Sequence, residues 1–188
     1  MDAPRKRLLE RLRTDAWRRG TFRLASGRDS DFFIDCKQVI LTAEGHRLCG
    51  EVLCEVIRSA GLAENVDAVA GVALGGCPLA SAVSLTSGLG AAPGWDALYV
   101  RKEPKNHGTA QRIEGRVSLS AVLRVVLLED VLTTGGSSRM AIEALRADGH
   151  TVLGVVALVD RCEGGREALE AMGLRVLPVF SRADFLGE

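Results

Sequence analysis

The sequence lacks several features that would point to other classes of protein. Its 188 residues contain no apolar run of the roughly 18 residues that a membrane-spanning helix needs. Lys and Arg (24) balance Asp and Glu (24), so no global basic field favours nucleic acid. Aromatic residues make up only 4% of the chain, yet 47% hydrophobic and 26% charged residues are typical of a globular protein. We therefore expect one domain over residues 1–188.

The five cysteines are scattered, and they contain no C-x-x-C pair. Because the sequence also shows no secretory leader, this usage predicts reduced thiols and a cytoplasmic protein. His46 and Cys49 are spaced i, i+3 on an expected helix, with Cys54 nearby. A zinc site needs a fourth ligand and tighter clustering, so these residues do not predict one.

Hydrophobic periodicity predicts helices that alternate with strands. The expected helices span residues 4–19, 42–60, 79–86, 138–148 and 164–172, and the expected strands span residues 22–24, 32–35, 66–73, 98–101, 125–128, 152–159 and 174–180. This order implies an α/β fold with a mostly parallel central sheet flanked by helices. Ligands of such sheets bind beyond the carboxyl ends of the strands. The polar turns expected there are residues 75–76, 101–102, 129–137 and 160–161.

The most informative stretch is residues 125–138, which reads VVLLEDVLTTGGSS. Its apolar start predicts a buried strand, and the backbone N–H groups of the following turn and helix can hold a doubly charged phosphate. Gly135 and Gly136 would let the backbone approach such a ligand closely. Glu129 and Asp130 would repel a phosphate, but they can accept hydrogen bonds from a vicinal diol. The stretch therefore indicates a site for a ribose 5-phosphate.

Thr133, Thr134 and Ser137 can add hydroxyl donors to the phosphate site. The plain alternative is an ordinary strand–turn–helix whose glycines only make the turn. A nucleotide-binding P-loop fits poorly, because G-x-x-x-x-G-K-[ST] is absent and no Lys follows the glycines. The ordered run resembles the phosphoribosyl pyrophosphate (PRPP) signature of type I phosphoribosyltransferases, in which two acidic residues precede a Thr-rich phosphate loop.

Residues 101–107 read RKEPKNH and carry three fixed cations and a histidine against one carboxylate. A solvated charged turn is the common outcome for such a run. Pro104, Gly108 and Gly115 nevertheless favour a mobile loop over about residues 102–116, and mobile cationic loops serve as lids. The side chains that would stabilise a departing pyrophosphate are Arg101, Lys102, Lys105 and His107.

The spacing R-K-E-x-K-x-H-G, followed by Ile-Glu-Gly at residues 113–115, resembles the catalytic loop of orotate phosphoribosyltransferases. The resemblance runs over nearly the whole chain. It implies transfer of 5-phosphoribosyl from PRPP to orotate, which gives orotidine 5′-monophosphate and pyrophosphate in UMP biosynthesis. It also implies an N-terminal hood over the base at about residues 20–41, Mg²⁺ bound through PRPP and water with no certain protein ligand, and a homodimer that shares the loop across its interface.

Carried over by motif position, the resemblance assigns Lys105, His107 and Asp130 to catalysis. It assigns Thr133, Arg161 and Phe33 to orotate, and a guanidinium can bind the carboxylate that distinguishes orotate from uracil. The residues that it implies for PRPP are Arg101, Lys102, Lys105, His107, Glu129, Asp130, Val131, Leu132, Thr133, Thr134, Gly135, Gly136 and Ser137.

The chain departs from some relatives at two positions. Those relatives carry Lys where this sequence has Ala25 and Gly75, and both lysines would face pyrophosphate or substrate. Either Arg28, Lys37 and the loop cations replace them, or turnover and affinity differ. Three alternatives stay open: transfer to another base such as a purine, a non-catalytic nucleotide sensor, and a purely structural α/β domain.

Overall fold

The computed structural model describes residues 1–23, 29–90, 93–103, 112–115 and 122–186, with backbone alone for residues 21–23 and 29–31. Its strands form two sheets, a two-stranded antiparallel one and a six-stranded one. The strands are β1 (Trp17–Arg23), β2 (Asp29–Ile34), β3 (Ala68–Val72), β4 (Asp96–Val100), β5 (Ile113–Glu114), β6 (Arg124–Leu132), β7 (Thr151–Asp160) and β8 (Arg175–Ser181). The helices are α1 (Ala3–Arg11), α2 (Lys37–Ile40), α3 (Ala43–Ser59), α4 (Gly76–Gly88), α5 (Gly136–Ala147), α6 (Gly165–Glu170) and α7 (Ala183–Leu186).

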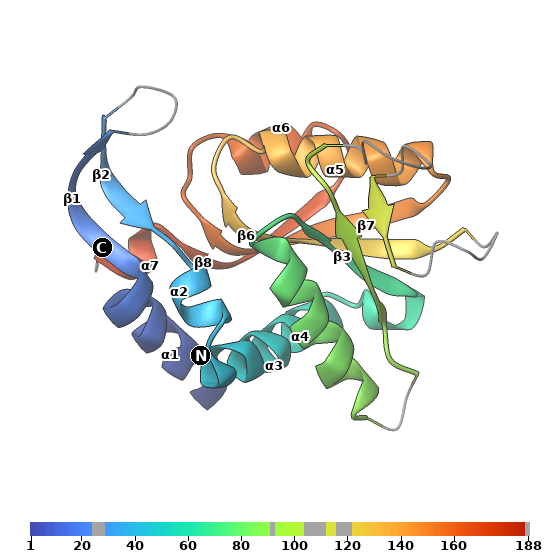
Figure 1. Cartoon of the computed structure of the whole chain (residues 1–188), viewed down its shortest axis with the longest axis horizontal. Coiled ribbons are helices and arrows are strands. Elements are labelled where there is room, and N and C mark those ends of the chain that lie inside the picture. Colours follow the sequence, from blue (N-terminus) through green and yellow to red (C-terminus); the bar gives the residue numbers. More distant parts are fainter. Residues whose placement is uncertain (24–28, 91–92, 104–111, 116–121, 187–188) are drawn as a thin grey trace.

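The six-stranded sheet has the order β5-β4-β3-β6-β7-β8, and its strands are parallel except for β5. Helices α3 and α4 cover one face and α5 and α6 the other (Figure 1). Successive side chains of β6 therefore enter two different cores: Val126 and Leu128 pack towards α3 and α4, while Val125 and Leu127 pack towards α5. This two-sided burial explains the unbroken apolar run and confirms the predicted α/β sheet.

Several predicted element boundaries were wrong, and three of them bear on the site or the N-terminal strands. The first helix does not run to residue 19, because a π-helical turn (Leu12–Ala16) follows α1 and Gly20 lies inside β1. Strand β6 continues four residues beyond Leu128, so the two acidic residues belong to the strand and do not follow it. Helix α4 begins at Gly76 and not at residue 79. Ala25 and Arg28 lie outside the described residues.

Strands β1 and β2 form a small antiparallel unit beside the main sheet (Figure 1). An aromatic cluster holds its base: the Phe32 ring centroid lies 6.3 Å from that of Trp17 and 5.6 Å from that of Phe185 in α7. Phe32 is fully buried. The cluster thus ties the N-terminal strands to the C-terminal end of the chain. None of the helices in the described part of the chain has the length and hydrophobicity needed to cross a bilayer.

Candidate active site

The predicted polar turns meet at one edge of the main sheet. Strands β3, β4, β6 and β7 are parallel neighbours, so their carboxyl ends lie side by side. The backbone N–H of Arg161 donates to the carbonyl of Leu132 across 2.9 Å, which places the end of β7 directly against the end of β6. On the other side of β6, Gly75 lies in contact range of the Asp130 carboxylate. The acidic pair Glu129–Asp130, the turn at residues 131–137 and Arg161 therefore share one location.

The turn after β6 leaves the first N–H groups of α5 open to a ligand. Gly135 adopts φ +80°, in the left-handed region that glycine enters at little cost, and the chain then turns into α5. No side chain in the described residues caps this helix start. Thr134 and Gly136 are exposed, while Thr133 is half-buried. Uncapped N–H groups together with the helix dipole make this end of α5 suitable for an anion.

A second glycine supports the turn from behind, and the sequence analysis missed it. A Cβ added at Gly165, the first residue of α6, would lie 2.3 Å from the Thr133 carbonyl oxygen and 2.9 Å from the Gly135 nitrogen. Any other residue at position 165 would displace backbone. The adjacent glycines at 164 and 165, soon after the Asp-Arg turn, were the available sequence signal.

Glu129 is 5% exposed and accepts two hydrogen bonds at its Oε2 atom. The Ser138 hydroxyl donates across 2.6 Å and the Ser137 hydroxyl across 3.1 Å. Burial raises the pKa of Glu129 to about 7, the neighbouring Asp130 charge also raises it, and the two hydroxyls oppose the rise. Since the Ser137 hydroxyl is directed to Glu129 here, its expected contact with phosphate stays a prediction.

Asp130 is half-buried, and its charge acts on Cys36 and Lys37 at the start of α2. A Cβ at Gly75 would lie 1.9 Å from its Oδ2 atom, so the carboxylate occupies the space that a side chain at 75 would need. Lys37 pairs with Asp35 across 2.5 Å. That hydrogen bond raises the pKa of Lys37, and the charge of Asp130 adds to the rise. The first residue of α2 therefore brings a cation towards the acidic pair.

Arg161 is buried between the end of β7 and the hood. Its side chain is 8% exposed, and it forms an ion pair with Glu163 across 2.7 Å. The guanidinium carbon lies 5.7 Å from the centroid of the Phe32 ring. Phe32 belongs to the core, whereas the neighbouring Phe33 is 41% exposed. Arg161 thus joins the predicted base-binding end of the site to the hood, and it already has a carboxylate partner.

Beyond the carboxyl end of β4, the start of the predicted cationic loop borders a hollow of about 500 Å³. Arg101 pairs with Glu114 of β5 across 3.2 Å, and Lys102 is exposed. The hollow is lined by Ala73, Cys77, Tyr99, Arg101, Lys102, Glu103 and Glu114. Lys105 and His107, the other two predicted loop cations, lie outside the described residues.

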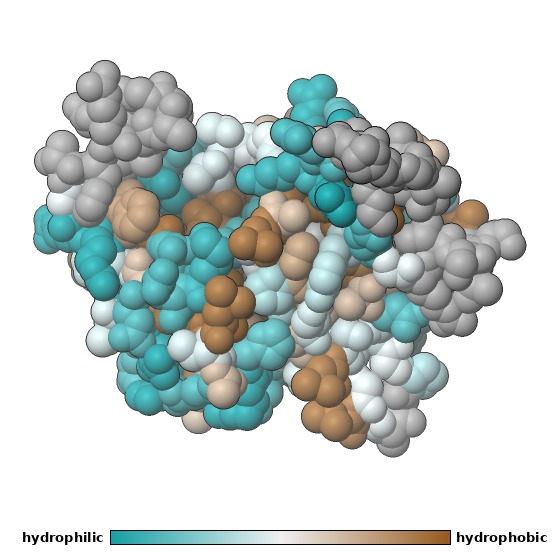
Figure 2. All heavy atoms as spheres, in the orientation of Figure 1, coloured by the Kyte–Doolittle hydropathy of each residue, from teal (hydrophilic) through white to brown (hydrophobic). Residues whose placement is uncertain are grey.

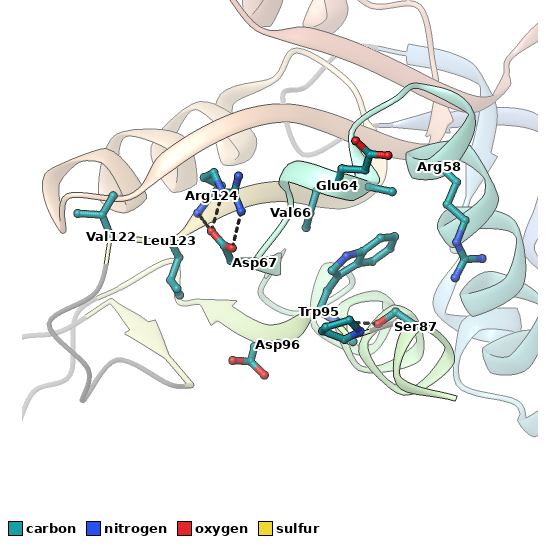
Figure 3. A pocket seen from close by; sticks show the side chains of 13 residues that line it. Arg58, Glu64, Val66, Asp67, Ser87, Trp95, Asp96, Val122, Leu123 and Arg124 are labelled. Carbon is teal, nitrogen blue, oxygen red and sulfur yellow. Dashed lines mark hydrogen bonds and ion pairs between the residues drawn. The ribbon is translucent and has the colours of Figure 1, made fainter. Parts of the chain in front are cut away.

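A larger cavity, of about 710 Å³, lies at the opposite, amino ends of β3, β4 and β6 (Figure 3). Asp67 and Arg124 form a two-pronged ion pair there, at 3.0 and 2.9 Å. The Arg58 guanidinium lies 5.8 Å from the centre of the Trp95 ring. None of the predicted site residues lines this cavity. It is therefore separate from the carboxyl edge of the sheet, where the predicted site residues lie.

Oxygen ligands for Mg²⁺ are present at the carboxyl edge. The described residues contain no group of three or more His, Cys, Asp or Glu side chains that could hold a metal. Glu129 and Asp130 do place two carboxylates at adjacent positions on β6. Because Mg²⁺ is commonly held by one or two carboxylates together with substrate phosphates and waters, this pair fits an ion that arrives with a phosphorylated substrate.

Comparison with known proteins shows the family to which the chain belongs. The family described as the phosphoribosyl transferase domain matches residues 40–172. The orotate phosphoribosyltransferase of Sorangium cellulosum is 54% identical over 182 residues, which cover 97% of this chain and 93% of the relative. That of Synechocystis is 43% identical over 180 residues, which cover 96% and 87% of the two chains.

Solved structures agree with these relatives. The orotate phosphoribosyltransferase of Mycobacterium tuberculosis, crystallised with PRPP, has a TM-score of 0.78 at 32% identity and covers 97% of this chain and 99% of its own. An adenine phosphoribosyltransferase from Leishmania donovani, 16% identical with a TM-score of 0.67, shares the fold alone. The chain belongs to the phosphoribosyltransferase family, as its sheet and phosphate turn indicate. Within that family it belongs with the orotate phosphoribosyltransferases.

Proposed function

We propose that this chain is an enzyme of UMP biosynthesis that transfers 5-phosphoribosyl from PRPP to N1 of orotate, giving orotidine 5′-monophosphate and pyrophosphate. The observation that carries the proposal is the convergence at one sheet edge of an uncapped helix start, two adjacent carboxylates and a buried arginine. These match the three parts of the reaction complex: the 5-phosphate, the ribose diol and the orotate carboxylate. The near full-length relatives named for this activity support the assignment.

In this proposal, PRPP lies along the turn between β6 and α5. Residues 131–137 hold the 5-phosphate through backbone N–H groups and hydroxyls, as a helix start does for anions. Glu129 and Asp130 accept hydrogen bonds from the ribose hydroxyls. As the bond from C1 to pyrophosphate breaks, its electron pair leaves with the pyrophosphate and positive charge develops at C1 and the ring oxygen. N1 of orotate forms the new bond to C1 and loses its proton, which the departing pyrophosphate takes up. Asp130 then lies close to that charge and stabilises it.

Orotate lies between the turn and the hood. Arg161 binds its carboxylate, which requires Glu163 to yield its place or share the guanidinium. Thr133 contacts the ring from the turn, and the exposed Phe33 covers it from the hood. A buried guanidinium that gains a substrate carboxylate explains the choice of orotate over uracil, because uracil would leave the arginine without that partner.

The pyrophosphate leaves towards the cationic loop. Arg101, Lys102, Lys105 and His107 stabilise the charge that grows on it, with Lys105 and His107 as the catalytic members. When bound, Mg²⁺ neutralises part of the diphosphate charge. Closure of the loop at about residues 102–116 keeps out water, which would otherwise compete with orotate for C1.

We also propose that residues 1–188 act as one domain with a hood, and that two copies form a cytoplasmic homodimer. Exposed apolar side chains support the dimer: Leu85 is 63% exposed and Leu89 79% exposed at the end of α4, and Leu74 is 71% exposed just before it. Figure 2 shows apolar patches over α4 on an otherwise largely hydrophilic face. All five cysteines are free, as in a reducing compartment.

The direct test is a spectrophotometric assay of orotate consumption with PRPP and Mg²⁺. We expect turnover with orotate and none with uracil or hypoxanthine under matched conditions. Turnover with hypoxanthine in place of orotate would replace the proposal with a purine enzyme. Binding of PRPP without turnover of any base would favour a nucleotide sensor.

A further inference from the structure

The two serines in the first turn of α5 differ in what they can reach. Ser137 is half-buried, so its hydroxyl borders both Glu129 and the open side of the turn. Ser138 is fully buried and donates its hydroxyl to Glu129 Oε2 across 2.6 Å. A side chain with no exposed surface cannot touch a substrate that enters from solvent. Ser138 therefore acts on the site only through Glu129.

Both hydroxyl bonds end on the same carboxylate oxygen. This arrangement fixes Glu129 by its Oε2 atom and leaves Oε1 without a bond from either serine. Because Oε2 is held by the two serines, Oε1 points in a fixed direction. A fixed acceptor suits a ribose diol, whose hydroxyl groups are also fixed relative to each other. Without the bonds, the side chain would have several staggered conformations to choose from.

We propose that Ser138 is a positioning residue for PRPP: it orients the buried Glu129 carboxylate, so that Glu129 accepts a hydrogen bond from a ribose hydroxyl. This inference rests on the proposed function, because it takes the ribose diol as the ligand of Glu129. It also joins two halves of the site. The serine lies in the helix whose first N–H groups hold the 5-phosphate, so the spacing between phosphate and diol contacts is set by one helical turn.

The test compares Ser138→Ala with the parent enzyme and with Ser87→Ala. Ser87 serves as the control because it is also a buried helical serine, but it lies at the opposite edge of the sheet. Its hydroxyl accepts a hydrogen bond from the backbone N–H of Trp95 across 2.9 Å. We expect Ser138→Ala to raise KM for PRPP roughly tenfold, the effect of losing one hydrogen bond to a charged group. KM for orotate and kcat should change less than twofold.

A purely structural role would give a different pattern. Ser87→Ala should lower the melting temperature without changing KM for PRPP, whereas Ser138→Ala should raise KM for PRPP with little change in kcat. An unchanged KM for PRPP in Ser138→Ala, with an active parent, would overturn the positioning role and leave the proposed function standing. If the parent shows no turnover, PRPP affinity by calorimetry takes the place of KM, and a parent that binds no PRPP would overturn both proposals.

Discussion

Replacing Glu129 with glutamine should stabilise the fold at alkaline pH while it weakens PRPP binding. Glu129 is 5% exposed, and burial raises the pKa of its carboxyl from an ordinary value of 4.5 to about 7. The folded state therefore binds this proton more tightly than the unfolded state does. Its contribution to stability is fully present below pH 4.5 and is lost as the pH rises through about 7.

The magnitude follows from the size of that shift. Linkage converts it into about 3 kcal/mol of unfolding free energy lost once the group is fully ionised, of which about 2 kcal/mol is lost between pH 5 and pH 8. Glutamine has no proton to lose in this range, and its amide oxygen can still accept from Ser137 and Ser138. For a chain of this length, the loss of about 3 kcal/mol at pH 8 corresponds to a Tm roughly 6–12 °C higher for the variant than for the parent.

The assay is urea unfolding of the parent and Glu129→Gln at pH 5 and pH 8, followed by circular dichroism. The expected result is a free-energy advantage of the variant that grows between the two pH values. Glu143→Gln is the matched control, because Glu143 is an exposed residue of α5 that pairs with Arg139 across 2.9 Å. An exposed pair contributes little, so this control should show almost no pH-dependent difference. An equal advantage for Glu129→Gln at both pH values would refute the idea that its carboxyl is the buried proton acceptor.

Three further substitutions test other parts of the site. Arg161→Ala should raise KM for orotate at least about tenfold and KM for PRPP much less, since a charge-assisted contact to the carboxylate is lost; equal losses for both substrates, measured by steady-state kinetics, would exclude the carboxylate role. Gly75→Ala should raise KM for PRPP, because a Cβ 1.9 Å from Asp130 Oδ2 must displace that carboxylate, and an unchanged KM would show that the displacement does not matter. Lys105→Ala should lower kcat by about 10²-fold, because a donor to the charge that develops on pyrophosphate is lost. If the variant formed orotidine monophosphate at the parent rate, Lys105 would have no catalytic role.

Much of the fold could be predicted because its signals are local. The apolar run at residues 125–128 needed only the rule that strands buried on both faces lack alternation, and the structure confirms a strand there. The N-terminal helix was extended too far because Trp17, Arg18 and Arg19 continue a helical pattern in sequence. Their pairing with Ile34, Phe33 and Phe32 of β2 overrides that pattern, and such pairing between distant segments leaves no local trace.

The site residues were predictable as a set but not in their contacts. The motif placed Glu129, Ser137 and Thr134 in one turn, and the structure brings them to one edge of the sheet. The motif alone could not show that the Ser137 hydroxyl is directed to Glu129, because side-chain direction depends on how α5 packs against β6. Gly165 escaped notice for the same reason. Its importance comes from the Thr133 carbonyl 2.3 Å from the place of a Cβ, a contact across 32 residues of sequence.

The absence of lysine at position 75 is explained by the same kind of close contact. In this chain the Asp130 carboxylate occupies the space beside Gly75, so a side chain there and Asp130 in its present position exclude each other. In the described part of the chain, the charge of Asp130 contributes to raising the pKa of Lys37, the first residue of α2. If a cation is needed beside the acidic pair, we therefore expect it to come from the hood and not from the turn after β3.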